Sequence, residues 1–135
     1  MVKRRRGARS ARTRSRHRPF EDLVSAALDT IPMPFADALN EVAIIIADEP
    51  SADQRSENEI PDGDTLYGLY EGVPRTEWGA DQAPIPNRIT LFRLPLEEDF
   101  ADPDDLADEV WVTVVHELAH HLGIDDERLH ELGVD

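Results

Sequence analysis

The stretch that decides the fold is Val112–Gly133, with the sequence VTVVHELAHHLGIDDERLHELG. It lies at the end of a helix that the preceding residues predict. Asp102 can cap that helix, Pro103 suits its first position, and the acidic residues that follow favour the positive end of its dipole. We expect the helix to run to Leu122 and to end at Gly123, before a short last helix over Asp125–Leu132.

The central part of this helix reads His116-Glu117-Leu118-Ala119-His120, which is the HExxH motif of zinc metalloproteases. Residues four apart lie on one face of a helix, about one turn from each other. Two imidazoles at that spacing can bind one tetrahedral Zn²⁺. Glu117 lies beside them and can take a proton from metal-bound water. The motif therefore predicts two metal ligands, His116 and His120, and one catalytic base, Glu117.

A helical wheel with about 100° per residue separates this motif from the predicted core face. The apolar stripe comprises Trp111, Val115, Leu118 and Leu122. The nearly opposite face carries Thr113, His116, Glu117 and His120. An ordinary solvent-exposed face would also be polar, but solvent exposure demands no particular residues at this spacing.

A catalytic zinc needs a third protein ligand besides water, and residues just beyond Gly123 are placed to supply it. Asp126 lies six residues after His120, at the position of the third ligand in HExxHxxGxx(H), with Asp in place of His. Asp125 can cap the next helix while Asp126 binds the metal, or the two can exchange roles. Glu127 and Glu131 are the alternative ligands. His121 points away from His116 on the wheel, so we expect it to pack or to support the site rather than bind metal.

Upstream, the pattern predicts a helix from Phe20 to Ile31 and three short strands. The strands are Val42–Ala47, Leu66–Tyr70 and Arg88–Leu94, of which the first reads as a buried central strand. Residues 50–64 and 72–87 are polar or rich in proline and glycine, and they are predicted to be loops.

Charge divides the chain into two unequal parts. Residues 1–18, the basic arm, hold nine Lys and Arg residues and no acid, and we expect them to be disordered in isolation. Residues 19–135, the body, hold five basic and 29 acidic residues, a formal charge of −24. Such a body repels nucleic acid and anionic lipid, so nucleic acid could bind only through the arm.

The composition also excludes several classes of protein. There is no cysteine, which excludes disulfides, thiolate nucleophiles and Cys-ligated metals. No apolar run approaches the ~20 residues of a membrane span, and no apolar segment follows the basic N-terminus. We therefore expect a soluble, cytoplasmic protein with one small domain, and the sequence does not indicate its oligomeric state.

Over about residues 20–133 the chain resembles the minimal zincin-like family of small bacterial zinc metallopeptidases. The specific part is HExxHxxGxxD at His116–Asp126, and FEDLVSAALDTIP, VAIIIADEP, LYGLYEGVPRTEW and PNRITLFRLPLE follow the family's order. The resemblance implies an α+β fold, with a short sheet of about three strands packed against a long active-site helix. It also implies one zinc ion held by His116, His120 and Asp126, with Glu117 as base and a peptide or protein as substrate.

Two other functions remain open at the level of sequence. A metal-dependent RNA-processing nuclease would use the basic arm to hold phosphates, but the known family with a similar helix lacks the Glu of HExxH. A structural metal site in an interaction protein would need a fourth protein ligand, for which His121 or Glu127 are the candidates.

Overall fold

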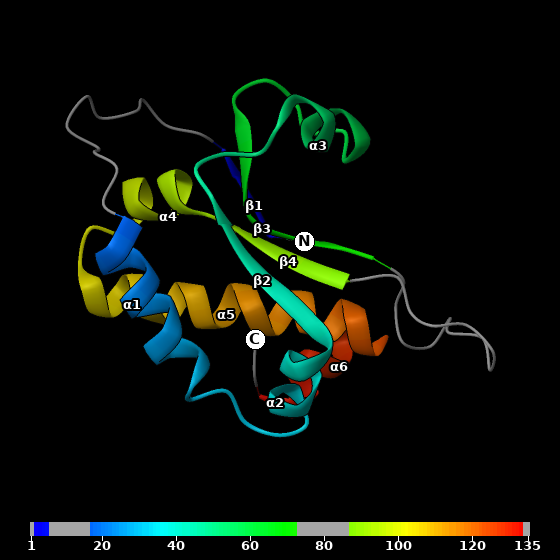
Figure 1. Ribbon diagram of the computed structural model, residues 1–135. Coiled ribbons are helices and arrows are strands. Elements are labelled where there is room, and N and C mark those ends of the chain that lie inside the picture. The colour runs from blue at the N-terminus through cyan, green and yellow to red at the C-terminus, as the bar shows by residue number, and fades with distance from the viewer. Residues whose placement is uncertain (1, 6–16, 73–86, 134–135) are drawn as a thin grey trace.

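The computed structural model describes residues 2–5, 17–72 and 87–133 of the 135-residue chain (Figure 1). The elements follow in the order β1 (Val2–Arg5), α1 (His17–Leu28), α2 (Phe35–Ala38), a 3₁₀ turn (Leu39–Glu41), β2 (Val42–Ala47), α3 (Ala52–Glu57), β3 (Asp64–Glu71), β4 (Asn87–Phe92), α4 (Arg93–Asp99), α5 (Pro103–Leu122) and α6 (Asp126–Leu132). This is the α+β architecture that the sequence predicts, with a short sheet packed against one long helix.

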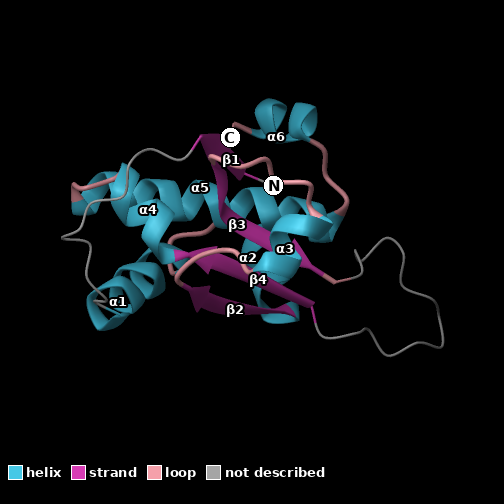
Figure 2. Cartoon of the chain, turned by 90° about the horizontal axis from the view of Figure 1, so that it is seen from above, coloured by secondary structure: helices cyan, strands magenta, loops and turns pink. Residues whose placement is uncertain are grey.

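The sheet has the strand order β1-β3-β4-β2 (Figure 2). β2 and β4 are parallel, with Ile44 opposite Ile89, and β3 is antiparallel to β4, with Gly68 opposite Leu91. The three predicted strands form β2, β3 and β4. β1 is a fourth strand, which comes from the basic arm and lies antiparallel to β3.

The long helix begins and ends where its sequence signals predict. The Asp102 side chain accepts a hydrogen bond from the Asp105 N–H, and Pro103 takes the first helical position. Gly123 ends the helix in the left-handed conformation at φ 76°, which glycine adopts without steric cost.

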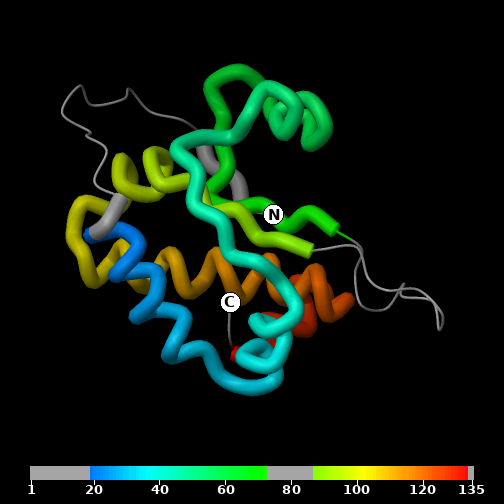
Figure 3. The backbone as a smooth tube through the Cα atoms, viewed as in Figure 1, coloured from blue at the N-terminus to red at the C-terminus, as the bar shows by residue number. Residues whose placement is uncertain are grey.

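The main core lies between α5 and the sheet, with α1 packed along the other side of α5 (Figures 1 and 3). α5 is buried on both of these sides, which explains why its buried residues extend beyond the predicted stripe. Val115 and Leu118 of that stripe are fully buried, and Trp111 and Leu122 are partly buried. A smaller apolar cluster covers the opposite face of the sheet; it comprises Ile60, Leu66, Leu69 and Phe92.

Two segments of the body differ from the sequence prediction. The predicted loop 50–64 contains α3, whose start is a capping box between Ser51 and Gln54. The third strand ends at Phe92 rather than Leu94, and the chain turns into α4. There the guanidinium of Arg93, only 1% exposed, is bound by Asp48 and Glu97.

In the basic arm the structure places a strand at Val2–Arg5, and α1 begins at His17, so the boundary expected at Pro19 falls inside that helix. Backbone pairing with an open edge of β3 supplies hydrogen bonds that the arm cannot make in isolation. Residues 6–16 and most of the second predicted loop, 73–86, lie outside the described residues. Within the described ranges, no helix combines the length and apolarity that a membrane crossing requires.

Candidate metal centre

The HExxH residues lie on the last two turns of α5, where that helix passes under the end of β3. His116 is partly buried, Glu117 is fully buried, and the side chain of His120 is 41% exposed. The motif therefore combines a buried carboxylate with two imidazoles that solvent reaches to different degrees. Full burial of Glu117 shows that the polar face of α5 is not an ordinary solvent-exposed one, because this part of the helix packs against β3.

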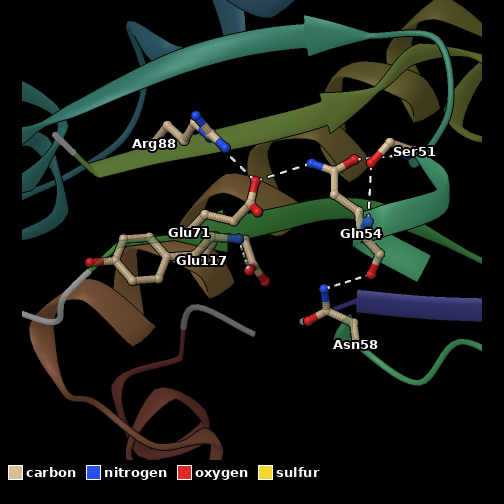
Figure 4. Close-up of polar contacts among 7 residues, drawn as sticks. Ser51, Gln54, Asn58, Glu71, Arg88 and Glu117 are labelled. Atoms are coloured by element: carbon tan, nitrogen blue, oxygen red, sulfur yellow. Dashed lines mark hydrogen bonds and ion pairs between the residues drawn. The ribbon is translucent and has the colours of Figure 1, made fainter. Parts of the chain in front are cut away.

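Glu117 is held by a main-chain group of β3. Its Oε1 accepts a hydrogen bond from the Tyr70 N–H at 2.8 Å (Figure 4), and the same oxygen lies 3.6 Å from His120 Nδ1. Burial by itself raises the pKa of Glu117. Hydrogen bonding with His120, together with the positive charges around the carboxylate, outweighs burial, so that the pKa of Glu117 lies below its ordinary value. Glu117 is thus an ionised carboxylate at neutral pH.

One turn before this carboxylate, α5 approaches β3 so closely that only glycine fits. A Cβ on Gly68 would lie 2.6 Å from Cγ2 of Thr113 and 3.3 Å from the Thr90 carbonyl oxygen. Thr113 is fully buried, and its hydroxyl has no hydrogen-bond partner among the described residues. The contact between Gly68 and Thr113 sets the distance between the helix and the strand beside the motif.

A second connection joins the same strand end to α5. His121 is fully buried, its Nδ1 lies 3.0 Å from the Tyr70 hydroxyl and its Nε2 lies 2.9 Å from Glu41 Oε1. With Nε2 protonated toward Glu41, Nδ1 accepts the hydrogen bond that the Tyr70 hydroxyl donates. Tyr70 thereby binds α5 twice, through its N–H at Glu117 and its hydroxyl at His121. Of the two roles expected for His121, packing is confirmed by its burial, and support of a metal site stays a prediction.

The next residue of β3 is fixed on the opposite side of the strand. Glu71 accepts hydrogen bonds from Arg88 of β4 at 3.3 Å and from Gln54 of α3 at 3.0 Å (Figure 4). Gln54 also closes the capping box with Ser51. The strand end that carries the Tyr70 N–H is therefore bound from both sides, which holds the Glu117 carboxylate in one position.

After α5 the chain turns at Gly123 and separates the roles of the two neighbouring aspartates. Asp125 caps α6, because its Oδ1 accepts a hydrogen bond from the Arg128 N–H at 2.8 Å. Asp126 is exposed in the first turn of α6. Of the two assignments that the sequence left open, Asp125 is the cap, and a metal ligand at Asp126 stays a prediction.

The donor chemistry of these residues suits zinc, which binds imidazole nitrogen and carboxylate oxygen. His116 and His120 lie one turn apart on α5, and the carboxylate of Asp126 follows in the first turn of α6. Across residues 2–5, 17–72 and 87–133, however, no group of three His, Cys, Asp or Glu side chains is close enough to share one ion. The third ligand is therefore not assembled in this structure.

The sequence did not indicate two parts of this site. Glu41 lies 80 residues from His121 in the chain, so no local pattern connects them. The Tyr70 N–H is a main-chain group that any residue except proline would carry at that position. The packing of β3 against α5 identifies the Tyr70 N–H, and the packing of the 3₁₀ turn Leu39–Glu41 against α5 identifies Glu41.

Comparisons with known proteins agree with this architecture. The profile of a family described as zincin-like metallopeptidase matches residues 39–134, from the 3₁₀ turn to just beyond α6. The chain is also similar in structure to a conserved hypothetical protein from Thermus thermophilus, with 25% identity and a TM-score of 0.51. That match covers 87% of this chain and 97% of the other. No curated protein matches the chain significantly.

Proposed function

Because the chain belongs to the zincin-like metallopeptidase family, we propose that it is a zinc-dependent peptidase with Glu117 as its general base. The observation that carries this proposal is the position of Glu117. It is fully buried, one of its oxygens lies 3.6 Å from His120 Nδ1, and the same oxygen is held by a main-chain N–H of the neighbouring strand. A buried carboxylate in a structural helix has no need of flanking imidazoles.

The zinc ion would be held by His116 and His120 of α5 and by Asp126 of α6. When bound, it would polarise the scissile carbonyl and lower the pKa of a coordinated water. Asp126 is the preferred third ligand because it is exposed and its neighbour Asp125 is already used as the cap of α6. The two helices that carry these donors are joined through the turn at Gly123, which is in the left-handed conformation.

Glu117 would accept a proton from the attacking water and pass it to the leaving amine. Its pKa lies below the ordinary value, so the group is ionised and ready to accept a proton at neutral pH. The Tyr70 N–H orients one of its oxygens. His121 and Glu41 act further away, because they hold the Tyr70 side chain and thus the strand end from which that N–H comes.

A closed structural metal site finds less support among the same residues. The fourth ligand would have to be His121 or Glu127. His121 is fully buried, and both of its ring nitrogens lie within hydrogen-bond distance of Tyr70 or Glu41. A site with three protein ligands leaves one position for water, which is the arrangement of a catalytic zinc.

The variant Glu117→Gln tests the proposal. Gln has nearly the same shape and can still accept the Tyr70 N–H through its amide oxygen, but it cannot take a proton. We expect the variant to retain zinc while its cleavage of a mixture of unstructured peptides falls at least about a hundredfold. Glu21→Gln, an exposed substitution on α1, is the matched control and should cleave like the wild type. A zinc-loaded Glu117→Gln protein with full activity would overturn the proposed role.

A further inference from the structure

The edge of β3 that pairs with β1 also carries the Tyr70 N–H, which Glu117 binds. β1 pairs antiparallel with β3, from Arg5 opposite Asp64 to Val2 opposite Gly68. In a strand, residues two apart present their N–H and C=O groups to the same edge. Gly68, which pairs with β1, and Tyr70 therefore face the same edge, and the Tyr70 N–H on that edge is bound by Glu117. The carboxylate takes the next hydrogen-bonding position beyond the end of β1.

We propose that the chain's own basic segment Val2–Arg5 occludes this edge of β3 and competes there with extended, basic peptides. The proposal rests on the proposed function and adds to it a substrate class and a form of self-occlusion. Addition of a strand to an exposed sheet edge is a general mode of peptide recognition, since main-chain hydrogen bonds supply affinity without requiring a particular sequence. Figure 2 shows β1 alongside β3 at the margin of the sheet.

β1 runs along β3 with its amino-terminal end toward the candidate site. Because the pairing is antiparallel, the amino-terminal side of β1 is the side nearest Tyr70 and Glu117. A longer peptide bound in the same place would continue past Gly68 and bring a peptide bond to the carboxylate. Peptide hydrolysis releases a product with a new amino terminus, and β1 lies along the edge in the direction that this product would have.

Charge favours a basic occupant over a neutral or acidic one. The body has a formal charge of −24, and the arm carries nine basic residues with no acid. The register places Arg5 opposite Asp64, and β1 contributes Lys3 and Arg4 between its ends. The acidic body attracts a basic strand electrostatically, and dissolved salt screens this attraction. Docking of the arm should therefore weaken as ionic strength rises.

The register also contains a bulge beside the site. Val2 pairs with Gly68 and Lys3 with Leu66, so Tyr67 is the extra residue on β3. Bulges re-aim the side chains that follow them and often occur next to active sites. Here the bulge precedes Gly68 and Tyr70, the two residues that contact α5 at Thr113 and at Glu117. The bulge therefore separates the register of β3 near Gly68 and Tyr70 from its register at residues 64–66.

The test uses the full chain with Lys3→Pro and Arg4→Pro combined. N–H groups of successive strand residues point to opposite edges, so one of these prolines removes a donor that faces β3. The matched control is Arg9→Pro with Arg12→Pro, which introduces as many prolines and removes as many charges outside β1. The probe is a labelled synthetic peptide with the sequence of residues 1–18, and the measurements are its binding and amide hydrogen exchange over residues 64–71.

In the variant with Lys3→Pro and Arg4→Pro, called the β1 variant, we expect amide hydrogen exchange over residues 64–68 to become at least about tenfold faster, and we expect no such change in the control. The peptide should bind the β1 variant at least about tenfold more tightly than the wild type or the control, and less tightly in high salt. A peptide with the same two prolines should not bind. Equal exchange in all three proteins, equal binding by all three, or equal binding of the proline peptide would overturn the proposal.

Two further arms keep the outcome unambiguous. Exchange of α5 amides reports whether the β1 variant is folded; if it is not, Lys3→Glu with Arg4→Glu replaces it and should also bind the peptide more tightly than the wild type. Binding of single-stranded RNA through the arm, with unchanged exchange over residues 64–68, would replace the proposal with a nucleic-acid tail.

Failure of this inference is distinguishable from failure of the proposed function. If the peptide binds as expected but the zinc-loaded protein cleaves no peptide, the edge remains a binding site and the peptidase proposal fails. If peptides are cleaved while β1 and the added peptide do not compete, the peptidase proposal stands and the docking of the arm fails.

Discussion

Replacement of Gly68 by alanine should destabilise the protein through one contact. The added Cβ would lie 2.6 Å from Cγ2 of Thr113, well inside the ordinary carbon–carbon separation of about 3.5–4.0 Å. Thr113 is fully buried on α5, so its methyl group cannot turn away into solvent. The helix and the strand must therefore separate by several tenths of an ångström, next to the turn that carries Glu117.

The structure allows the cost to be estimated. Overpacking of a buried site costs about 1–3 kcal/mol, and the conformational restriction of alanine returns about 0.5–1 kcal/mol. Gly68→Ala should thus lower the free energy of unfolding by about 1–2 kcal/mol. With a urea m-value of about 2 kcal/mol/M, the unfolding midpoint should fall by roughly 0.5–1 M.

The variant Thr113→Ser tests the cause, because it removes Cγ2 and keeps the hydroxyl. In that background the nearest atom to the new Cβ outside Thr113 is the Thr90 carbonyl oxygen at 3.3 Å. Gly68→Ala should then cost less than about 0.5 kcal/mol, so the double-mutant cycle should show a coupling of about 1 kcal/mol or more. Urea unfolding of the four proteins measures it. If Gly68→Ala costs the same in both backgrounds, the assumed contact between helix and strand is wrong.

Three further predictions concern the same helix. His121→Ala should lower the free energy of unfolding by about 3–5 kcal/mol, since it removes a buried ring and its bonds to Tyr70 and Glu41; a loss below about 1 kcal/mol in urea unfolding would contradict those bonds. Thr113→Val should stabilise by about 1 kcal/mol, because the hydroxyl is buried without a partner among the described residues; clear destabilisation would reveal a partner. Burial, with a smaller effect of Asp99, raises the pKa of Glu109. The ionised carboxylate therefore destabilises the fold at pH values above this raised pKa. The destabilisation disappears as the pH falls to the ordinary pKa of a glutamate, about 4.3, where the group is protonated in the folded protein. Glu109→Gln should therefore stabilise at pH 7 by less than about 1 kcal/mol and not at pH 4, and an equal gain at both would exclude this cause.

Much of the fold followed from local signals in the sequence. The bounds of α5 were predictable because Asp102, Pro103 and Gly123 each act through a local backbone interaction. β2 was predictable as a short β-branched run between polar residues. α3 was missed although Ser51 and Gln54 form a capping box, because the polar composition of the segment was given more weight than its cap.

The candidate site was only partly predictable, for a different reason. His116, Glu117 and His120 belong to one helix, so the sequence spacing was enough to predict that they lie near one another on α5. What surrounds them depends on the sheet. The partners of Glu117 and His121 are Tyr70 and Glu41, which come from two other segments. The pairing of Val2–Arg5 with β3 was likewise not predicted, because the arm has no strand pattern of its own and depends on an edge supplied elsewhere.

Zinc binding by the wild type, Asp126→Ala and Asp125→Ala, measured by metal analysis after equilibrium dialysis, decides whether Asp126 completes a zinc site with His116 and His120. These neighbours differ in role, since Asp125 caps α6 and Asp126 is the proposed ligand. We expect tight zinc binding by the wild type and by Asp125→Ala, which should lose only about 1 kcal/mol of stability. Asp126→Ala should bind zinc at least about tenfold more weakly. A wild type that takes up no zinc would contradict the proposed zinc site, and an Asp126→Ala protein that binds zinc as tightly as the wild type would contradict the role of Asp126 as its ligand.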